Sequence, residues 1–382
     1  MRKIFLMVAA AAAAMLATSF TACKSNPPEP PEPPNNIDIY VAGIDESGAE
    51  DAAKVWKNGK ELYSLTDGSK FAAAYSVFVV GGDVYTAGCE DNGKNKIVKV
   101  WKNDKELYAL TDGSDYAGAN SVFVAEDKVY TVGNDGNVAK LWKNKSATNL
   151  TNGSYRANAF SVFVAGSNVY TAGYEIKGMK YVAKVWKNGS ELFTLTDGSK
   201  NADAYSVFVV GEDVYTAGSA HNGTTYVAKV WKNGSELFAL TDGSNNADTY
   251  SVFVVGKDVY TAGSEHNGTK WVAKVWKNKK EIFHTSGSKD AYAYSVYVVG
   301  EDVYVAGDEG SAAKVWKNGE ELYNLTNDGS AKSIVVHNGD VYVAGFESDG
   351  SNNVAKVWKN GKELYKLADK SIAYSIFIAE RK

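Results

Sequence analysis

The feature that most constrains this chain is a five-residue phrase, "KVWKN", which recurs eight times with one variation, Leu141 in place of valine. The intervals between successive tryptophans of the phrase are 45, 41, 44, 45, 45, 40 and 42 residues. Self-similarity at a period of about 40 residues indicates a fold that stacks one supersecondary unit many times. Eight units fill the sequence from Asn36 to its end, and their tryptophans are Trp56, Trp101, Trp142, Trp186, Trp231, Trp276, Trp316 and Trp358.

Each unit predicts four β-strands. Residues 205–243 read "YSVFVVGEDVYTAGSAHNGTTYVAKVWKNGSELFALTDG", in which runs of Val, Tyr, Phe, Trp and Thr are separated by "VGED", "HNG", "KNGS" and "TDGS". β-branched and aromatic runs bounded by Gly, Asn and Asp are typical of strands and tight turns. Apolar residues occur on both faces of the third run, 227–232, so the sheet needs cover on both sides. A four-stranded antiparallel sheet stacked between neighbours at this period is a β-propeller blade.

The two ends of the repeat region predict how the ring closes. The body opens on a second strand, "IDIYVAG" at 37–43, and finishes on an inner strand, "AYSIFIA" at 373–379. The last strand is therefore expected to complete the first blade. The fold class predicted for residues 37–382 is all-β, an eight-bladed β-propeller closed by its C-terminal strand.

The units resemble WD repeats. "YSVFVVGED" corresponds to the inner strand, "VYTAGS" to the second, "VAKVWKNG" to the third and "ELFALTDGS" to the outer strand. The tryptophan of the third strand matches that pattern, and the second strand carries a threonine in five units: Thr86, Thr131, Thr171, Thr216 and Thr261. The histidine that WD repeats carry before the inner strand is absent from every unit, so their buried hydrogen-bond tetrad is not carried over.

The first 22 residues predict an exported protein. Arg2 and Lys3 precede an apolar stretch, 4–20, and small residues lead up to Cys23, which is the layout of a secretory signal. The end of the stretch resembles a bacterial lipobox, so we expect removal of residues 1–22 and lipidation of Cys23 as the membrane anchor. Cleavage by an ordinary signal peptidase is the alternative.

Residues 23–36 predict a tether. The segment "KSNPPEPPEPPNN" holds all six prolines of the chain, and proline there favours an extended spacer with no core to bury. Lys24 follows the cysteine, which resembles Gram-negative lipoproteins of the outer membrane. Whether the body faces the periplasm or the cell surface is left open.

Charge and cysteine content limit the partners and the sources of stability. Without the signal the chain carries 39 Lys and Arg against 45 Asp and Glu, a net charge of −6. A mildly acidic, mixed surface argues against nucleic acid as a partner. Cys89 is the one cysteine left once Cys23 is lipidated, so packing has to stabilise the body, which we expect to be monomeric.

The recurring residues have a structural interpretation. Residues that every blade carries are those that every blade needs for packing, turning or capping. Trp231 offers large buried area between blades, and Asn233-Gly234 suits a tight hairpin turn. The alternative is a multivalent carbohydrate binder that uses one equivalent site per blade.

The residues that differ between units are the candidates for recognition. The turn after the second strand and the segment leading into the inner strand vary, whereas the "VGED" and "KNG" turns are nearly uniform. In a WD-like blade the two varied loops open on the same face, and loops on a rigid scaffold commonly carry binding residues. Unselected drift of the loops is the alternative. The candidate ligand-binding residues, aromatic or arginine anchors on this face, are Phe71, Tyr116, Tyr155, Arg156, Tyr174, Tyr181, Tyr226, Trp271 and Phe346.

No motif in the sequence indicates an enzyme, a metal or a cofactor. The four histidines have no recurring Asp or Cys partner, and the acidic turns "CEDNG" and "FESDG" lack the ligand spacing of a calcium loop. We therefore expect a non-catalytic, lipid-anchored binding module with a protein or glycan ligand at the bacterial envelope. A propeller hydrolase or lyase is the further alternative, and it predicts a cluster of charged side chains at the channel mouth.

Overall fold

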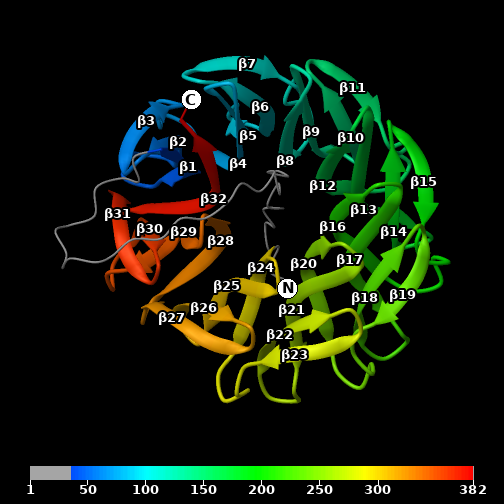
Figure 1. Cartoon of the computed structure of the whole chain (residues 1–382). Helices are drawn as coiled ribbons and strands as arrows, with labels where there is room; N and C mark the ends of the chain where they lie inside the picture. Colours follow the sequence, from blue (N-terminus) through cyan, green and yellow to red (C-terminus); the bar gives the residue numbers. More distant parts are fainter. Residues whose placement is uncertain (1–35, 382) are drawn as a thin grey trace.

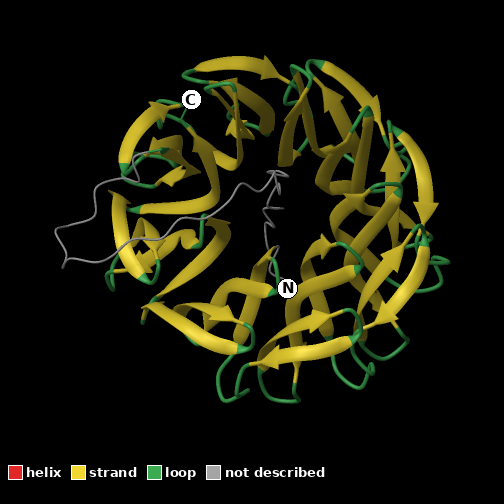
Figure 2. Ribbon diagram, in the orientation of Figure 1, coloured by secondary structure: helices red, strands yellow, loops and turns green. Residues whose placement is uncertain are grey.

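The structure, a computed structural model, describes residues 36–381, and within this range the chain forms strands and turns with no helix (Figure 2). None of the described residues therefore belongs to a helix that is long and apolar enough to cross a membrane. The predicted signal peptide, 1–22, and the predicted tether, 23–36, lie outside the described residues except for Asn36.

Eight four-stranded antiparallel sheets are arranged in a ring around a central axis (Figure 1). In seven of the sheets the chain runs outward from the axis, so consecutive strands are neighbours and the blade is a simple meander. This arrangement confirms the eight-bladed β-propeller that the repeat period predicts. It also confirms four strands in each blade.

The two strands of each blade that lie nearest to the axis are long and mostly buried. The inner strands are β4 (Ala72–Val80), β8 (Ala117–Ala125), β12 (Ala157–Ala165), β16 (Ala202–Val210), β20 (Ala247–Val255), β24 (Ala291–Val299), β28 (Gly329–His337) and β32 (Ser371–Glu380). The second strands are β1 (Ile37–Asp45), β5 (Asp83–Asp91), β9 (Lys128–Asp135), β13 (Asn168–Lys177), β17 (Asp213–His221), β21 (Asp258–His266), β25 (Asp302–Glu309) and β29 (Asp340–Ser348).

The third strands carry the repeated phrase, and the outer strands form the circumference. The third strands are β2 (Ala52–Lys57), β6 (Lys96–Lys102), β10 (Val138–Lys143), β14 (Lys180–Lys187), β18 (Tyr226–Lys232), β22 (Trp271–Lys277), β26 (Ala312–Lys317) and β30 (Asn353–Lys359). The outer strands are β3 (Lys60–Ser64), β7 (Lys105–Ala109), β11 (Ser146–Asn149), β15 (Ser190–Thr194), β19 (Ser235–Ala239), β23 (Lys280–His284), β27 (Glu320–Thr326) and β31 (Lys362–Asp369).

The last strand closes the ring in the predicted way. β32 pairs antiparallel with β1, with Ile39 opposite Ile378, so the first sheet has the order β3-β2-β1-β32. Both ends of the described chain thus lie in one blade (Figure 1). Antiparallel pairing along the whole of β1 ties them together without a disulfide.

Tryptophan packing joins each blade to its neighbour. Trp231 is 1 % exposed and lies in one apolar cluster with Tyr170, Val185 and Leu195, which belong to the preceding blade. The other tryptophans of the phrase are equally buried. Burying an aromatic side chain of this size contributes about 2–3 kcal/mol, so eight such contacts are a principal source of stability.

Candidate ligand-binding face

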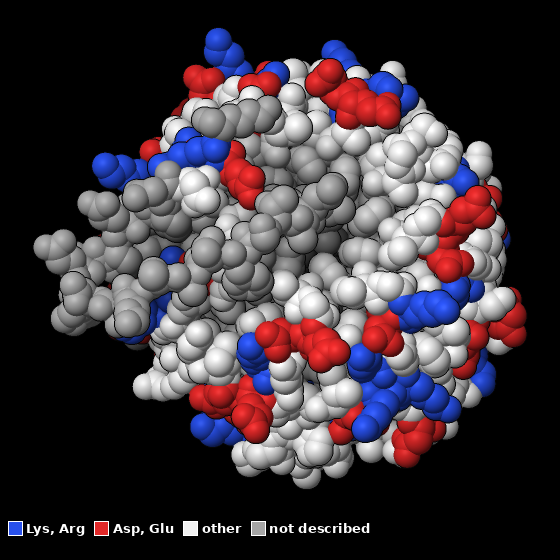
Figure 3. Space-filling view, viewed as in Figure 1, with Lys and Arg blue, Asp and Glu red and all other residues white. Residues whose placement is uncertain are grey.

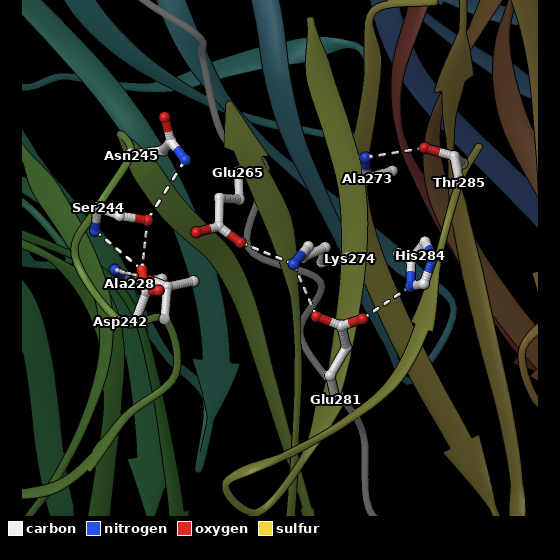
Figure 4. Close-up of polar contacts among 11 residues, drawn as sticks. Ala228, Asp242, Ser244, Asn245, Glu265, Ala273, Lys274, Glu281, His284 and Thr285 are labelled. Carbon is white, nitrogen blue, oxygen red and sulfur yellow. Dashed lines mark hydrogen bonds and ion pairs between the residues drawn. The ribbon is translucent and has the colours of Figure 1, made fainter. Parts of the chain in front are cut away.

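The lysine before each tryptophan is engaged by the acidic residues of its own blade. In the sixth blade the Lys274 Nζ lies 2.7 Å from Glu265 on the second strand and 2.7 Å from Glu281 on the outer strand (Figure 4). The same lysine pairs with an outer-strand glutamate in seven of the eight blades. The ammonium of the phrase therefore has partners inside the blade.

The asparagine of the phrase holds the turn between the third and outer strands. Asn233 has a φ of 50°, and its Oδ1 accepts a hydrogen bond from the Val214 N–H at 2.8 Å. Its Nδ2 donates to Asp213, which also pairs with Lys232 at 2.7 Å. The repeated polar residues thus serve the fold of each blade.

A second turn is built in the same way on "TDGS". Asp242 accepts hydrogen bonds from the Ser244 N–H and hydroxyl, and in the next blade the Thr285 hydroxyl accepts one from the Ala273 N–H at 3.1 Å (Figure 4). Aspartate that bonds to the backbone two residues on forms an Asx-turn. This turn leads into the varied segment before the inner strand.

The two varied loops of each blade meet at one end of the ring. In the fifth blade the His221 N–H, at the end of the second strand, donates to the Asn201 carbonyl just before the inner strand, at 2.7 Å. Asn201 also reaches back to the preceding blade, where its Oδ1 accepts from the Tyr181 N–H at 3.0 Å. We call this end of the ring the varied face. In every blade it is formed by the turn after the second strand and by the segment that leads into the inner strand.

The predicted residues differ in how far they reach into solvent. Tyr116 and Tyr155 are 55 % and 50 % exposed, and Arg156 is exposed beside Tyr155. Tyr174 is 6 % exposed, so its side chain is buried where the sequence suggests an accessible one. Phe71 is half-buried under the Lys96 ammonium, which lies 3.8 Å from its ring centroid.

The remaining predicted residues lie against aromatic or histidine neighbours. Tyr181 contacts Tyr174 with ring centroids 4.8 Å apart. Tyr226 and Trp271 open their third strands, and each meets a histidine ring edge-on, at 5.0 and 5.5 Å. The ring centroid of Phe346 lies 5.7 Å from the ammonium of Lys332, a residue of the inner strand β28. The nine predicted residues therefore form several small groups on one face.

One group of mainly aromatic residues near the varied face is one that the sequence pattern does not single out. Every inner strand has a β-bulge at the residue before its serine, where the pairing register with the second strand shifts. We call the eight bulge residues the collar. They are Tyr75, Asn120, Phe160, Tyr205, Tyr250, Tyr294, Lys332 and Tyr374.

A glycine opposite each bulge makes the collar possible. A Cβ on Gly218 would lie 2.0 Å from the Asp203 carbonyl oxygen, a distance that no side chain tolerates. The same glycine occurs in all eight second strands. Bulges re-aim side chains and are frequent beside functional sites. Here every bulge lies in the half of its inner strand that follows the varied segment, as Tyr205 does in Ala202–Val210.

Neighbouring collar side chains touch one another across the blade boundaries. Ring centroids lie 5.5 Å apart for Phe160 and Tyr205, 6.4 Å for Tyr205 and Tyr250, and 6.2 Å for Tyr250 and Tyr294. The next residue, Lys332, places its ammonium 4.5 Å from the Tyr294 ring. Five consecutive blades therefore present a continuous arc.

Besides Phe346 beside Lys332, two predicted residues connect to this arc. Tyr174 lies 5.7 Å from Phe160 at one end. At the other end Trp271 lies 6.0 Å from Tyr292, which is stacked on Tyr294 at 6.1 Å with nearly parallel rings. The structure thus joins two groups of predicted residues through inner-strand side chains that the sequence analysis did not single out.

Burial shifts the pKa values of the ionisable groups at the arc. Burial raises the pKa of Tyr294, and the adjacent Asp308 carboxylate adds to the shift. Burial likewise raises the pKa of Asp308, against hydrogen bonds that favour its charged form. Burial lowers the pKa of Lys332, which the negative charge of Asp308 partly offsets. Burial also raises the pKa of Tyr174 to about 12.

A polar cleft of about 520 Å³ also opens between the second and third blades. Its lining includes Asp112, Asp115, Asp135 and Lys140, and Asp135 pairs with Lys140 at 2.7 Å. The cleft lies on the varied face beside Tyr116, whose carbonyl accepts from the Gly136 N–H. On the face drawn in Figure 3, acidic and basic residues are interspersed around the circumference.

Two histidines of the varied face stabilise the backbone of the turns to which they belong. His221 Nδ1 accepts a hydrogen bond from the Gly223 N–H at 3.0 Å, and His266 does the same for Gly268 at 3.1 Å. Among residues 36–381 no group of three His, Cys, Asp or Glu side chains is placed to hold a metal ion. The chemistry that the face offers is ring stacking, hydrogen bonding to carboxylates, and one collar ammonium.

Comparison with known proteins supports the architecture. No protein-family model and no curated protein matches the chain. Solved structures do match, among them the computationally designed Ika8 protein, with 18 % identity, a TM-score of 0.54, and coverage of 83 % of this chain and 93 % of that chain. Sqt1 of Chaetomium thermophilum is 11 % identical, with a TM-score of 0.43 and coverage of 76 % and 83 %. At 18 % identity the likeness to the Ika8 protein concerns the fold alone.

Proposed function

We propose that this protein is a non-catalytic binding module, anchored by lipid at Cys23 to the bacterial outer membrane, which binds a protein or glycan through the varied face. The anchor and tether rest on the sequence of residues 1–36. The propeller is a rigid ring that suits such a role, because its loops are displayed on a scaffold that needs no rearrangement to bind.

The observation that carries the proposal is that the repeated residues make contacts within the ring, whereas residues of the varied face are exposed to solvent. The Lys, Trp and Asn of each phrase already contact residues of their own or the neighbouring blade, as Lys274, Trp231 and Asn233 do. The varied face instead combines exposed aromatic residues with the collar. Partly exposed rings of this kind are common anchors for protein partners and for sugars.

The test is a glycan array followed by calorimetry on the body from Asn36 onward, which contains every described strand and closes on itself through β32. One ligand bound per chain supports the varied face. Close to eight per chain would move the binding site to the repeated phrase and overturn the proposal. If no glycan binds, the same body is used to capture a protein partner from the envelope, and the absence of both would refute a binding role.

A further inference from the structure

Lys332 interrupts the collar at a position where most blades carry an aromatic ring. Tyrosine or phenylalanine occupies six of the eight collar positions, and asparagine occupies one. Both amide donors of Asn120 are used, because its Nδ2 donates to Asn158 Oδ1 at 2.9 Å and to the Ala159 carbonyl at 2.7 Å. Lys332 is the one collar residue with a positive charge.

The ammonium of Lys332 is held by aromatic faces. It lies 4.5 Å from the centroid of Tyr294 and 5.7 Å from that of Phe346, within the range of cation–π attraction. Such contacts position a cation but accept none of its N–H bonds. Within residues 36–381 no oxygen accepts a hydrogen bond from this ammonium, and no carboxylate forms an ion pair with it.

Asp308, the acidic group that acts electrostatically on Lys332, already accepts hydrogen bonds at both carboxylate oxygens. Asp308 accepts hydrogen bonds from the Tyr294 hydroxyl at 2.9 Å, the Ser330 hydroxyl at 2.9 Å and the Ala331 N–H at 3.2 Å. Its charge acts on Lys332 through space. Both oxygens of the Asp308 carboxylate therefore have partners, whereas the three donors of the Lys332 ammonium have none within residues 36–381, although partly buried donors without acceptors are costly.

We propose that Lys332 is a ligand-binding residue that receives the carboxylate of an acidic glycan on the varied face. A carboxylate seated there gains charge-assisted hydrogen bonds from donors that the protein leaves unused. The sugar rings would stack along the adjacent arc, from Tyr294 to Phe160, where aromatic rings follow one another at centroid distances of 5.5 to 6.4 Å and all but Tyr250 are partly exposed. This inference rests on the proposed function and adds the chemical class of the ligand.

The chain supplies its own control substitutions. Lys332→Tyr introduces the side chain found at five other collar positions, so the blade is expected to fold. Asn120→Tyr makes the same change at the other polar gap in the collar. Lys332→Arg keeps the positive charge, with donors in a different arrangement.

The experiment compares carboxylate-bearing oligosaccharides, such as trigalacturonate, with their methyl esters on the body from Asn36 onward. We expect the acid form to bind about 10- to 100-fold more tightly than the ester, as the loss of a charged hydrogen bond implies. Lys332→Tyr should abolish the difference, Lys332→Arg should keep part of it, and Asn120→Tyr should leave it intact.

The failures of the two proposals are distinguishable. Glycan binding by the wild-type body with no preference for carboxylates, or a preference that survives Lys332→Tyr, overturns this inference and leaves the proposed function standing. Binding of acidic peptides but of no glycan overturns the assignment to sugars. A body that binds neither glycan nor protein refutes the proposed function itself.

Discussion

The hydroxyl of Ser375 accepts a hydrogen bond from the Val77 N–H at 3.4 Å, although the two residues are 298 positions apart in the sequence. It joins the closing strand β32 to the inner strand of the second blade. The equivalent serines make the same contact at four other blade boundaries, at 3.2 to 3.4 Å. One small side chain therefore links neighbouring inner strands around most of the ring.

The first prediction concerns this link. Ser375→Ala leaves the buried Val77 N–H without an acceptor and should destabilise the body by about 1 kcal/mol. Ser295→Ala is the matched control, because the Ser295 hydroxyl is buried and has no hydrogen-bond partner within residues 36–381. Urea unfolding monitored by tryptophan fluorescence would show a lower midpoint for Ser375→Ala alone. Equal midpoints for the two variants would contradict the role of the link.

The second prediction concerns the acid stability of ring closure. Asp38 on β1 binds Arg381 at 2.7 Å beyond the end of β32, and it also pairs with Lys57. Burial by itself would raise the pKa of Asp38, but hydrogen bonds from Lys57, Asn58 and Arg381 outweigh it and hold the pKa at about 2, below the usual 3.8. A depressed carboxyl pKa stabilises the fold above the unfolded value and loses that contribution as pH falls.

The stability of the wild type should therefore fall as the pH is lowered from about 4 to about 2. Asp38→Asn should lower the stability at pH 7 and should reduce its dependence on pH in this range. The profile is measured as thermal midpoint against pH. Asp104→Asn is the control, since Asp104 is exposed and forms no ion pair within residues 36–381. If the control flattens the profile as much as Asp38→Asn does, Asp38 is not the group responsible.

The third prediction separates backbone strain from steric contact at the "KNG" turn. Gly234 has a φ of 83°, and a Cβ there would lie 2.5 Å from Phe193 Cδ1 in the preceding blade. Gly256 has a φ of 60°, and a Cβ there would have nothing within 4 Å. Gly256→Ala should cost about 1 kcal/mol, the strain of a left-handed residue, whereas Gly234→Ala should cost at least about 2 kcal/mol because the ring must also move. Chemical unfolding of both variants measures the difference, and similar costs would show that Phe193 yields freely.

The sequence was sufficient to predict the architecture. The spacing of the tryptophans implies eight units, and the order of strands at the two ends implies that β32 closes the first blade. Both inferences depend on periodicity alone, which is independent of the neighbours of any one side chain. For the same reason the buried tryptophans were recognisable before their contacts were known.

The collar could not be found by the same reasoning. Its side chains depend on a bulge, and the bulge depends on the pairing of inner and second strands, for example Ala204 with Gly218. A period-two pattern assigns Tyr205 to the packed face of a regular strand. The usable signals were the glycine repeated in every second strand and the departures from tyrosine at Asn120 and Lys332.

The fourth prediction tests the varied face directly. Tyr155 is 50 % exposed, and Trp271 leads to the collar through Tyr292, so we expect Tyr155→Ala and Trp271→Ala each to weaken ligand binding by about tenfold or more. Val299→Ala is the control, because Val299 is 46 % exposed at the opposite end of its inner strand. Calorimetry with the ligand identified on the array gives both affinity and stoichiometry. Binding that survives both aromatic substitutions, with several ligands per chain, would place recognition on the repeated phrase, because only residues present in every blade provide equivalent sites.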